Sequence, residues 1–248
     1  MDNYFAGTSG LVLPVPNKTY YPVQFKDKSR IAYYGSLFNS IEINSSFYKI
    51  PQSKIIAKWA ESVPDNFRFT FKLWQGITHE KELLYNPADL DRFIQAINAA
   101  GNCKGCFLIQ FPPGVRINLL PQLQELIGRI READPDQIWQ PALEFRHPSW
   151  YTEHIQQFAE ENLLTIVIQD IPSSATPFYY AAGNTVYLRF HGPGGKYSGS
   201  YSAEVLQEYS TYIREWREEG KTVYAYFNNT MGDAVQNLAT LNALVEQA

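Results

Sequence analysis

The chain alternates between short apolar runs and longer segments in which apolar residues recur at helical spacing. Several of the short runs are almost continuously apolar, as expected for parallel strands that are buried on both faces. They predict eight strands, at Tyr4–Gly7, Ser40–Asn44, Phe67–Leu73, Cys106–Phe111, Ala142–Arg146, Leu164–Gln169, Thr185–Phe190 and Thr222–Phe227.

Helical patterns lie between these runs, at Ser29–Phe38, Ser53–Ser62, Pro87–Ala100, Leu119–Glu132, Glu153–Glu161, Ala203–Glu219 and Ala234–Glu246. Asn86 and Ser202 are predicted N-caps, and Gly220 lies where a helix should end. The alternation continues without a linker, which predicts a single α/β domain over 1–248. We expect a TIM-type (β/α) barrel, with a mostly parallel eight-stranded sheet closed on itself. An open doubly wound sheet is the alternative, but Gly7-Thr8-Ser9-Gly10 does not match its dinucleotide fingerprint.

Composition and charge narrow the class of protein. With 248 residues and 45% hydrophobic residues, the chain can form one sizeable core. A net charge of -4 argues against non-specific nucleic-acid binding. No apolar run approaches the roughly 20 residues that a membrane span needs, and the N-terminus is unlike a signal peptide. We therefore predict a soluble cytoplasmic protein without a membrane partner. The C-x-x-C formed by Cys103 and Cys106 leads into a predicted strand and has no second cysteine pair nearby, which predicts a structural role.

The segment from Glu144 to Trp150 combines charged residues with the end of an apolar run. Alternate residues of a strand point to opposite faces, so Glu144 and Arg146 should share one face, opposite Leu143 and Phe145. A buried acid and base are costly to desolvate unless they are paired. The strand is therefore expected to present a paired carboxylate and guanidinium on one face.

Polar residues recur at the C-terminal ends of most predicted strands, where barrels place their functional groups. The predicted catalytic residues are Glu42, Glu144, His147, Asp170 and His191. The predicted substrate-binding residues are Asn44, Lys72, His79, Gln110, Arg146, Trp150, Arg189, Tyr197 and Asn228. The structural alternative is a polar core held by internal ion pairs. The glycine-rich segment around Tyr197 predicts either a mobile surface loop or a lid over the pocket.

Cations are at least as numerous as anions among these residues, although the whole chain is acidic. That favours an anionic, phosphate-bearing substrate and a hydrolase-type enzyme, with carboxylates as bases and histidines as acids. A metal-dependent hydrolase is an alternative. The sequence has no nucleotide-cofactor motif. It is compatible with a divalent metal cofactor, but we assign no residues as metal ligands. A glycosidase, and a non-catalytic module that binds an anion or a nucleic-acid end, are further alternatives.

Several motifs together resemble the YecE-like family, also called domain of unknown function 72. They are Gly7-Thr8-Ser9-Gly10, Phe38 to Tyr48, Phe67-Arg68-Phe69, Lys72 with Thr78-His79, Gln110-Phe111-Pro112-Pro113, Glu144 to Trp150, Arg189-Phe190-His191-Gly192 and Tyr226-Phe227-Asn228-Asn229. The resemblance spans nearly the whole chain. It implies a TIM-type barrel without an established activity. The family's pocket also resembles that of barrel nucleases that act on abasic DNA, and this likeness is an analogy only.

Overall fold

The strands form two hydrogen-bonded sheets, and every pairing between neighbouring strands is parallel. The computed structural model describes residues 3–247, except for the side chains of Tyr179 and Ala182. One sheet has the strand order β1-β9-β8-β7 and the other β2-β3-β4-β5-β6. The strands are β1 (Tyr4–Thr8), β2 (Ser40–Ile43), β3 (Arg68–Lys72), β4 (Lys104–Phe111), β5 (Gln140–Phe145), β6 (Thr165–Ile166), β7 (Ile168–Gln169), β8 (Thr185–Phe190) and β9 (Thr222–Phe227).

The two sheets meet at two places. Only Val167 separates β6 from β7, and its N–H donates to the Leu143 carbonyl at 2.9 Å. At the other meeting point, a parallel bridge joins Ser9, which follows β1, to Glu42 of β2. The single strand predicted over Leu164–Gln169 is therefore divided between the sheets. The α/β class and the parallel strands are confirmed, whereas one closed eight-stranded sheet stays a prediction.

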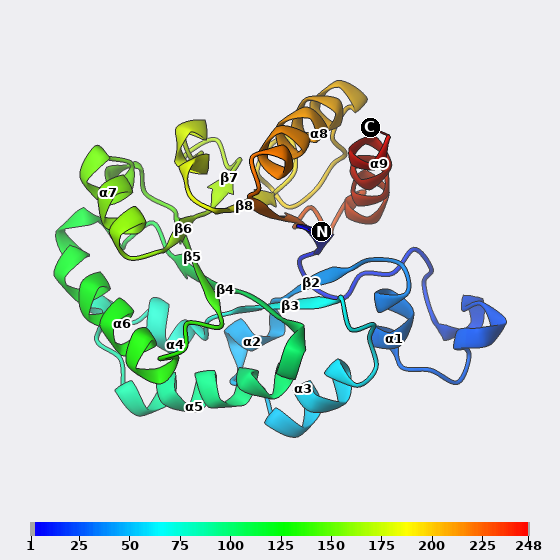
Figure 1. The fold of residues 1–248 in the computed structure, drawn as a ribbon, viewed down its shortest axis with the longest axis horizontal. Helices are drawn as coiled ribbons and strands as arrows, with labels where there is room; N and C mark the ends of the chain where they lie inside the picture. Colours follow the sequence, from blue (N-terminus) through cyan, green and yellow to red (C-terminus); the bar gives the residue numbers. More distant parts are fainter. Residues whose placement is uncertain (1–2, 248) are drawn as a thin grey trace.

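Helices lie outside the strands, with α5, α6 and α7 along one flank and α8 and α9 along another (Figure 1). The predicted helices are present, and their ends shift by a few residues. Two single-turn helices, α2 and α4, were too short to show a helical period in the sequence. The helices are α1 (Arg30–Gly35), α2 (Ser45–Tyr48), α3 (Ser53–Ala60), α4 (Gln75–Thr78), α5 (Pro87–Ile97), α6 (Leu120–Ala133), α7 (Glu153–Glu161), α8 (Ala203–Glu218) and α9 (Ala234–Glu246).

Short 3₁₀ helices occupy several of the connections. They are η1 (Lys18–Tyr20), η2 (Val23–Phe25), η3 (Lys81–Leu83), η4 (Asn98–Cys103), η5 (Ile117–Leu119), η6 (Pro148–Trp150) and η7 (Phe178–Ala182). Of these, η6 directly follows the charged end of β5, so it matters for the site described below.

The core has two layers, because each strand buries both of its faces. Leu143 and Phe145 belong to the large cluster between strands and helices, as the alternation predicted. A smaller cluster lies on the opposite faces of the strands and takes side chains from both sheets: Phe5, Cys106, Leu108, Ala142, Val167, Tyr187, Tyr224 and Tyr226. The Tyr226 hydroxyl also bonds Ser40 at 2.6 Å and Thr70 at 2.7 Å. The inner faces of the two sheets are thus packed against each other.

The predicted helix caps are confirmed. The side chain of Asn86 accepts a hydrogen bond from the Ala88 N–H at 3.1 Å. Ser202 accepts one from the Val205 N–H, and Gly220 follows α8 with a φ of 81°, the left-handed conformation in which helices often end.

Replacing Asn86 with alanine should lower the free energy of unfolding by about 1 kcal/mol, because the first turn of α5 loses its side-chain acceptor. Urea denaturation would measure the loss. Asn86→Ser keeps an acceptor and is the matched control, with an expected loss of a few tenths of a kcal/mol. Equal stability of Asn86→Ala and the unmodified protein would contradict the capping role.

Candidate active site

Charged side chains gather at the C-terminal ends of strands from both sheets. Because the strands are parallel, these ends lie at the same end of the molecule. Lys72 is the last residue of β3, while Glu144 and Arg189 are the second-last residues of β5 and β8. Each occupies the inner face of its strand, because the flanking residues pack in the outer core. Lys72, Glu144 and Arg189 therefore lie at the same end of the strands, as predicted.

Arg189 is the centre of the cluster and is 2% exposed. Its Nε lies 3.1 Å and 3.0 Å from the two carboxylate oxygens of Glu42, and its Nη2 lies 2.7 Å from Oε1. Nη1 donates to Glu144 Oε2 at 3.0 Å. The planar guanidinium thus joins two buried carboxylates, in a geometry that charge-assisted hydrogen bonds favour. The Tyr187 hydroxyl donates a further hydrogen bond to Glu42.

Both carboxylates are ionised. Burial raises the pKa of Glu42, but the Arg189 guanidinium outweighs burial and lowers it below the ordinary value. Burial opposes ionisation of Glu144 as well, yet Arg146 and Arg189 together lower its pKa to about 2. Arg146 Nη2 lies 2.5 Å from Glu144 Oε1, so the pair predicted from the sequence is confirmed.

His191 is held in one tautomer by its neighbours. Its Nε2 lies 2.8 Å from Arg189 Nη1 and 3.0 Å from Arg146 Nη2. Guanidinium groups only donate, so Nε2 must accept, and the proton lies on Nδ1. Nδ1 is 3.2 Å from the Asp170 carboxylate. Burial and the nearby Arg189 lower the pKa of His191, which agrees with a neutral ring.

Asp170 is a positioning residue for His191. Its Oδ1 also accepts the backbone N–H of His191 at 2.8 Å, and its other oxygen accepts from the Tyr201 hydroxyl. The same hydroxyl accepts the Gly192 N–H at 2.6 Å. Asp170 thus fixes both the ring and the backbone at the end of β8, and its catalytic role stays a prediction.

Lys72 is half-buried at the end of β3. Its Nζ is 3.9 Å from the centre of the Phe47 ring. Among the described residues, no carboxylate lies within ion-pair distance of this ammonium. Burial and the positive charge of Arg189 lower the pKa of Lys72 to about 8. This amine is therefore neutral in a larger fraction of molecules near pH 8 than an ordinary lysine would be.

His79 packs against the same phenylalanine, with its ring centre 4.9 Å from that of Phe47. Its Nδ1 is 2.8 Å from the Thr78 hydroxyl. Burial, together with Lys72 and Arg146, lowers the pKa of His79 to about 4. The imidazole is therefore neutral at physiological pH and adds no positive charge beside Lys72.

Several buried polar atoms at this end have no hydrogen-bond partner within the described part of the chain, among them Asn44 Oδ1 and Arg146 Nε. Asn44 directly follows Ile43, which pairs with Phe71, so it lies beside Lys72. Gln110 is buried as the second-last residue of β4. Buried polar groups are normally hydrogen-bonded, so these unpaired atoms are places where a ligand could bind.

Two predicted site residues, His147 and Trp150, make local structural contacts. His147 caps η6 through Nδ1, which accepts the Ser149 N–H at 3.1 Å. Trp150 is fully buried, donates to the Val115 carbonyl at 2.9 Å and stacks on Phe145. Both side chains are thus held by local partners around η6, which the sequence did not indicate, and their catalytic and substrate-binding roles stay predictions.

The last two predicted contacts lie at the rim. The Asn228 backbone N–H donates to Phe190 at 2.7 Å, and its side chain is buried where β9 ends. Tyr197 is 39% exposed, and its ring meets that of His191 edge-on at 5.6 Å. The glycine-rich loop therefore places an aromatic ring against the charged cluster.

Sequence reasoning missed three contributors to the site. Tyr187 could have been found, because it precedes Arg189 by two residues and shares its face of β8. Tyr201 and Phe47 gave no such signal, since each reaches the cluster from a loop or a single-turn helix.

The donor set does not fit a metal ion. Among the described residues, no group of three or more histidine, cysteine, aspartate or glutamate side chains is arranged to hold one. Arginine donors occupy the carboxylates of Glu42 and Glu144 and the Nε2 of His191. Displacing them would leave buried cations without partners.

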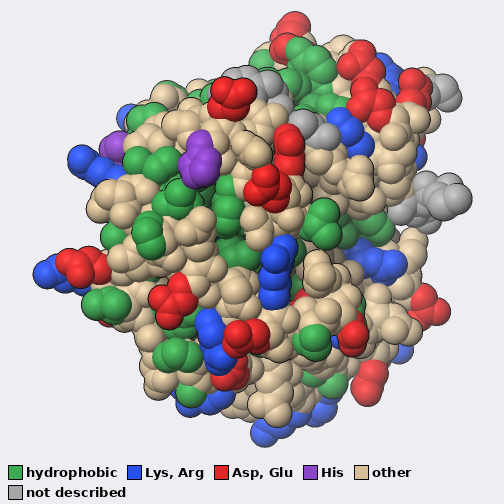
Figure 2. Space-filling view, turned by 60° about the vertical axis from the view of Figure 1, so that its left-hand side comes forward, with side chains coloured by type: hydrophobic (Ala, Val, Ile, Leu, Met, Phe, Trp, Pro, Cys, Tyr) green, Lys and Arg blue, Asp and Glu red, His purple; other side chains and the backbone are tan. Residues whose placement is uncertain are grey.

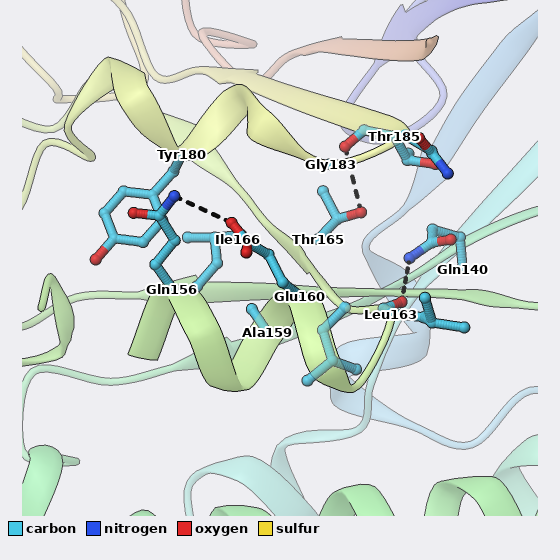
Figure 3. A pocket seen from close by; sticks show the side chains of 12 residues that line it. Gln140, Gln156, Ala159, Glu160, Leu163, Thr165, Ile166, Tyr180, Gly183 and Thr185 are labelled. Carbon is cyan, nitrogen blue, oxygen red and sulfur yellow. Dashed lines mark hydrogen bonds between the residues drawn. The ribbon is translucent and has the colours of Figure 1, made fainter. Parts of the chain in front are cut away.

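A separate cavity of about 340 Å³ lies at the other end of the strands. It is lined by the first residues of β5, β6 and β8, namely Gln140, Thr165 and Thr185, and by α7 (Figure 3). Glu160, whose carboxylate accepts from Gln156 at 3.1 Å, is the charged side chain among its described lining residues. Proteins with a barrel of this type place their active sites at the C-terminal ends of the strands. The charged cluster is therefore the stronger candidate site.

The fold and the cluster define a class: parallel α/β proteins with a buried arginine–carboxylate network at the C-terminal ends of the strands. The chain belongs to the family described as "Protein of unknown function DUF72", which matches residues 5–248. UPF0759 protein YunF of Bacillus subtilis is 26% identical over 249 residues, which cover 88% of this chain and 86% of YunF. UPF0759 protein YecE of Escherichia coli K12 is 25% identical over 120 residues, which cover 48% of this chain and 42% of YecE.

Solved structures support the fold. A DUF72 family protein from Enterococcus faecalis is 23% identical, with a TM-score of 0.79 over 99% of this chain and 96% of its own. One from Thermotoga maritima is 22% identical, with a TM-score of 0.70 over 98% and 99% of the two chains. A D-psicose 3-epimerase is similar at a TM-score of 0.53 and 11% identity, over 87% of this chain and 88% of its own.

Proposed function

We propose that this protein is an enzyme that binds a small anionic substrate at the C-terminal ends of its strands. Arg146 would bind the anion and Lys72 would transfer the proton. The observation that supports this assignment is the pairing pattern: the central charges are satisfied internally, whereas Lys72 lacks an ion-pair partner and Arg146 keeps an unpaired buried Nε among the described residues. A single domain with its sheets closed into a barrel would form the walls of this site.

The roles differ from those predicted from the sequence. Arg189 directs Nε, Nη1 and Nη2 to Glu42, Glu144 and His191, so it organises the site and leaves substrate binding to other groups. Glu42 and Glu144 have lowered pKa values, which makes them weak bases near neutral pH. Two ionised carboxylates also lack the protonated acid that a glycosidase needs.

Lys72 supplies what the carboxylates lack. A general base works best when its pKa is close to the working pH, and the pKa of Lys72 is about 8. Both hydrolysis of a phosphate-bearing substrate and proton transfer beside a carbonyl need such a group. The neighbouring cation Arg146 favours a substrate with a phosphate or carboxylate.

A nucleic-acid partner has less support. The face around α6 and α7 shows acidic and basic side chains intermingled with hydrophobic ones (Figure 2). A binder of phosphate backbones normally presents a continuous basic surface. In the described part of the chain, no helix has both the length and the apolar character that crossing a membrane requires.

Replacing Arg146 with glutamine should weaken the binding of inorganic phosphate by about 10- to 100-fold, the size of a lost hydrogen bond to a charged group. Isothermal titration calorimetry would measure the affinity. Arg131→Gln is the matched control, because Arg131 is an exposed arginine of α6 that lies near Gln140, at the other end of β5. Equal phosphate affinity for Arg146→Gln and the unmodified protein would refute the assigned role of Arg146.

A further inference from the structure

We infer that Lys72 is a nucleophile that forms an iminium adduct with an anionic carbonyl compound. This inference rests on the proposed function and names the substrate class of the same site. It goes beyond proton transfer, because the amine would bond covalently to carbon.

The first argument is the position of the amine. Lys72 ends β3, its side chain is half-buried, and its Nζ lies on the face of Phe47 at 3.9 Å. An aromatic face stabilises an ammonium only modestly, whereas a carboxylate partner would hold it charged. The Lys72 ammonium lies on an aromatic ring and, among the described residues, has no carboxylate within ion-pair distance.

The second argument is the charge around the amine. The charged groups that act on it are Arg189, Glu144, Glu42 and Arg146, and neutral His79 shares the Phe47 ring with it. Each carboxylate is paired with an arginine, at 2.7 Å and 2.5 Å, so neither forms an ion pair with Lys72, and Arg189 acts on the amine more strongly than either carboxylate. A desolvated lysine beside another cation is the usual way in which proteins activate an amine for this chemistry.

The third argument is the surrounding binding capacity. Asn44 Oδ1 beside Lys72 is a buried acceptor without a partner, and Arg146 Nε is a buried donor without one, both among the described residues. An acceptor fits a substrate hydroxyl, and the guanidinium fits a carboxylate or phosphate. A small molecule with a carbonyl, an anionic group and a hydroxyl would match all three groups.

The covalent step balances without a further reactant. The nitrogen lone pair attacks the carbonyl carbon, a C–N bond forms, and the carbonyl oxygen takes a proton to give a carbinolamine. That hydroxyl then leaves as water. In total, the protonated amine and the carbonyl compound give an iminium ion and one water molecule.

Reductive methylation with formaldehyde and cyanoborohydride tests the amine itself, because formaldehyde needs no binding site. Peptide mass spectrometry at neutral pH should show Lys72 reacting on the order of 100-fold faster than Lys104, which is also half-buried but starts β4 at the other end of the sheet. Lys72→Met should abolish the rapid labelling, and Lys104→Met should keep it. Equal rates at Lys72 and Lys104 would overturn the inference.

A second measurement tests the substrate class. Pyruvate with cyanoborohydride should label Lys72 at least about 10-fold faster than neutral acetone does, and Arg146→Gln should remove that preference. Equal labelling by the two ketones would refute the anionic class. If Lys72 fails to react while phosphate binding still depends on Arg146, the covalent role falls and the proposed function survives. If phosphate binding is independent of Arg146, the proposed function falls by its own test.

Discussion

The Arg189→Met substitution is expected to destabilise the protein by about 3–5 kcal/mol near neutral pH. Removing one partner of a buried ion pair leaves the other as an uncompensated charge. Here a single guanidinium joins two fully buried carboxylates, Glu42 and Glu144, so both are affected at once. Urea unfolding followed by circular dichroism would give the free energy.

Two variants separate charge from packing in this experiment. Glu42→Gln combined with Arg189→Met removes one of the orphaned charges and should recover part of the lost stability. Arg92→Met, at an arginine whose side chain is 66% exposed, should change stability by less than about 1 kcal/mol. A loss at Arg189 no larger than that at Arg92 would show that the network is not needed for stability.

The second large effect is the response of Glu144 to acid. Its pKa is lowered from 4.5 to about 2 in the folded protein, because Arg146 and Arg189 outweigh the cost of burial. The folded state therefore holds this proton less tightly than the unfolded state. Its contribution is complete above pH 4.5 and is lost as the pH falls towards 2. At about 1.4 kcal/mol per pKa unit, that contribution is about 3 kcal/mol.

Glu144→Gln should accordingly be less stable than the unmodified protein by about 3 kcal/mol near neutral pH. The two proteins should converge in stability towards pH 2, where the carboxyl of Glu144 takes up its proton. Glu218→Gln, at an exposed glutamate of α8, is the control and should follow the unmodified protein throughout. A constant difference between Glu144→Gln and the unmodified protein over this pH range would contradict the lowered pKa.

Much of the fold followed from local patterns. Apolar periodicity located the strands and the longer helices, and cap residues such as Asn86 marked where helices begin. Alternation along β5 correctly placed Glu144 and Arg146 on one face and Phe145 on the other. These features depend on residues a few positions apart, which is the range over which strand and helix periods act.

The roles within the site followed from contacts that no local pattern contains. Arg189 and Glu42 lie 147 positions apart in the chain, yet they are bonded at 2.7 Å. Neither spacing nor composition indicates that Arg189 would form ion pairs with two carboxylates. His147 was predicted to be catalytic and Trp150 to bind substrate, but no local pattern indicated that His147 would cap η6 and that Trp150 would be buried in the core.

The sequence by itself determined the parallel α/β class, the positions of most elements, the family and the end of the strands at which charged residues gather. Only the tertiary structure decided which charges neutralise one another, and so which remain available at Lys72 and Arg146. The physical reason is that periodicity specifies the face on which a side chain lies, whereas pKa and reactivity depend on its burial and on every charge within a few ångströms.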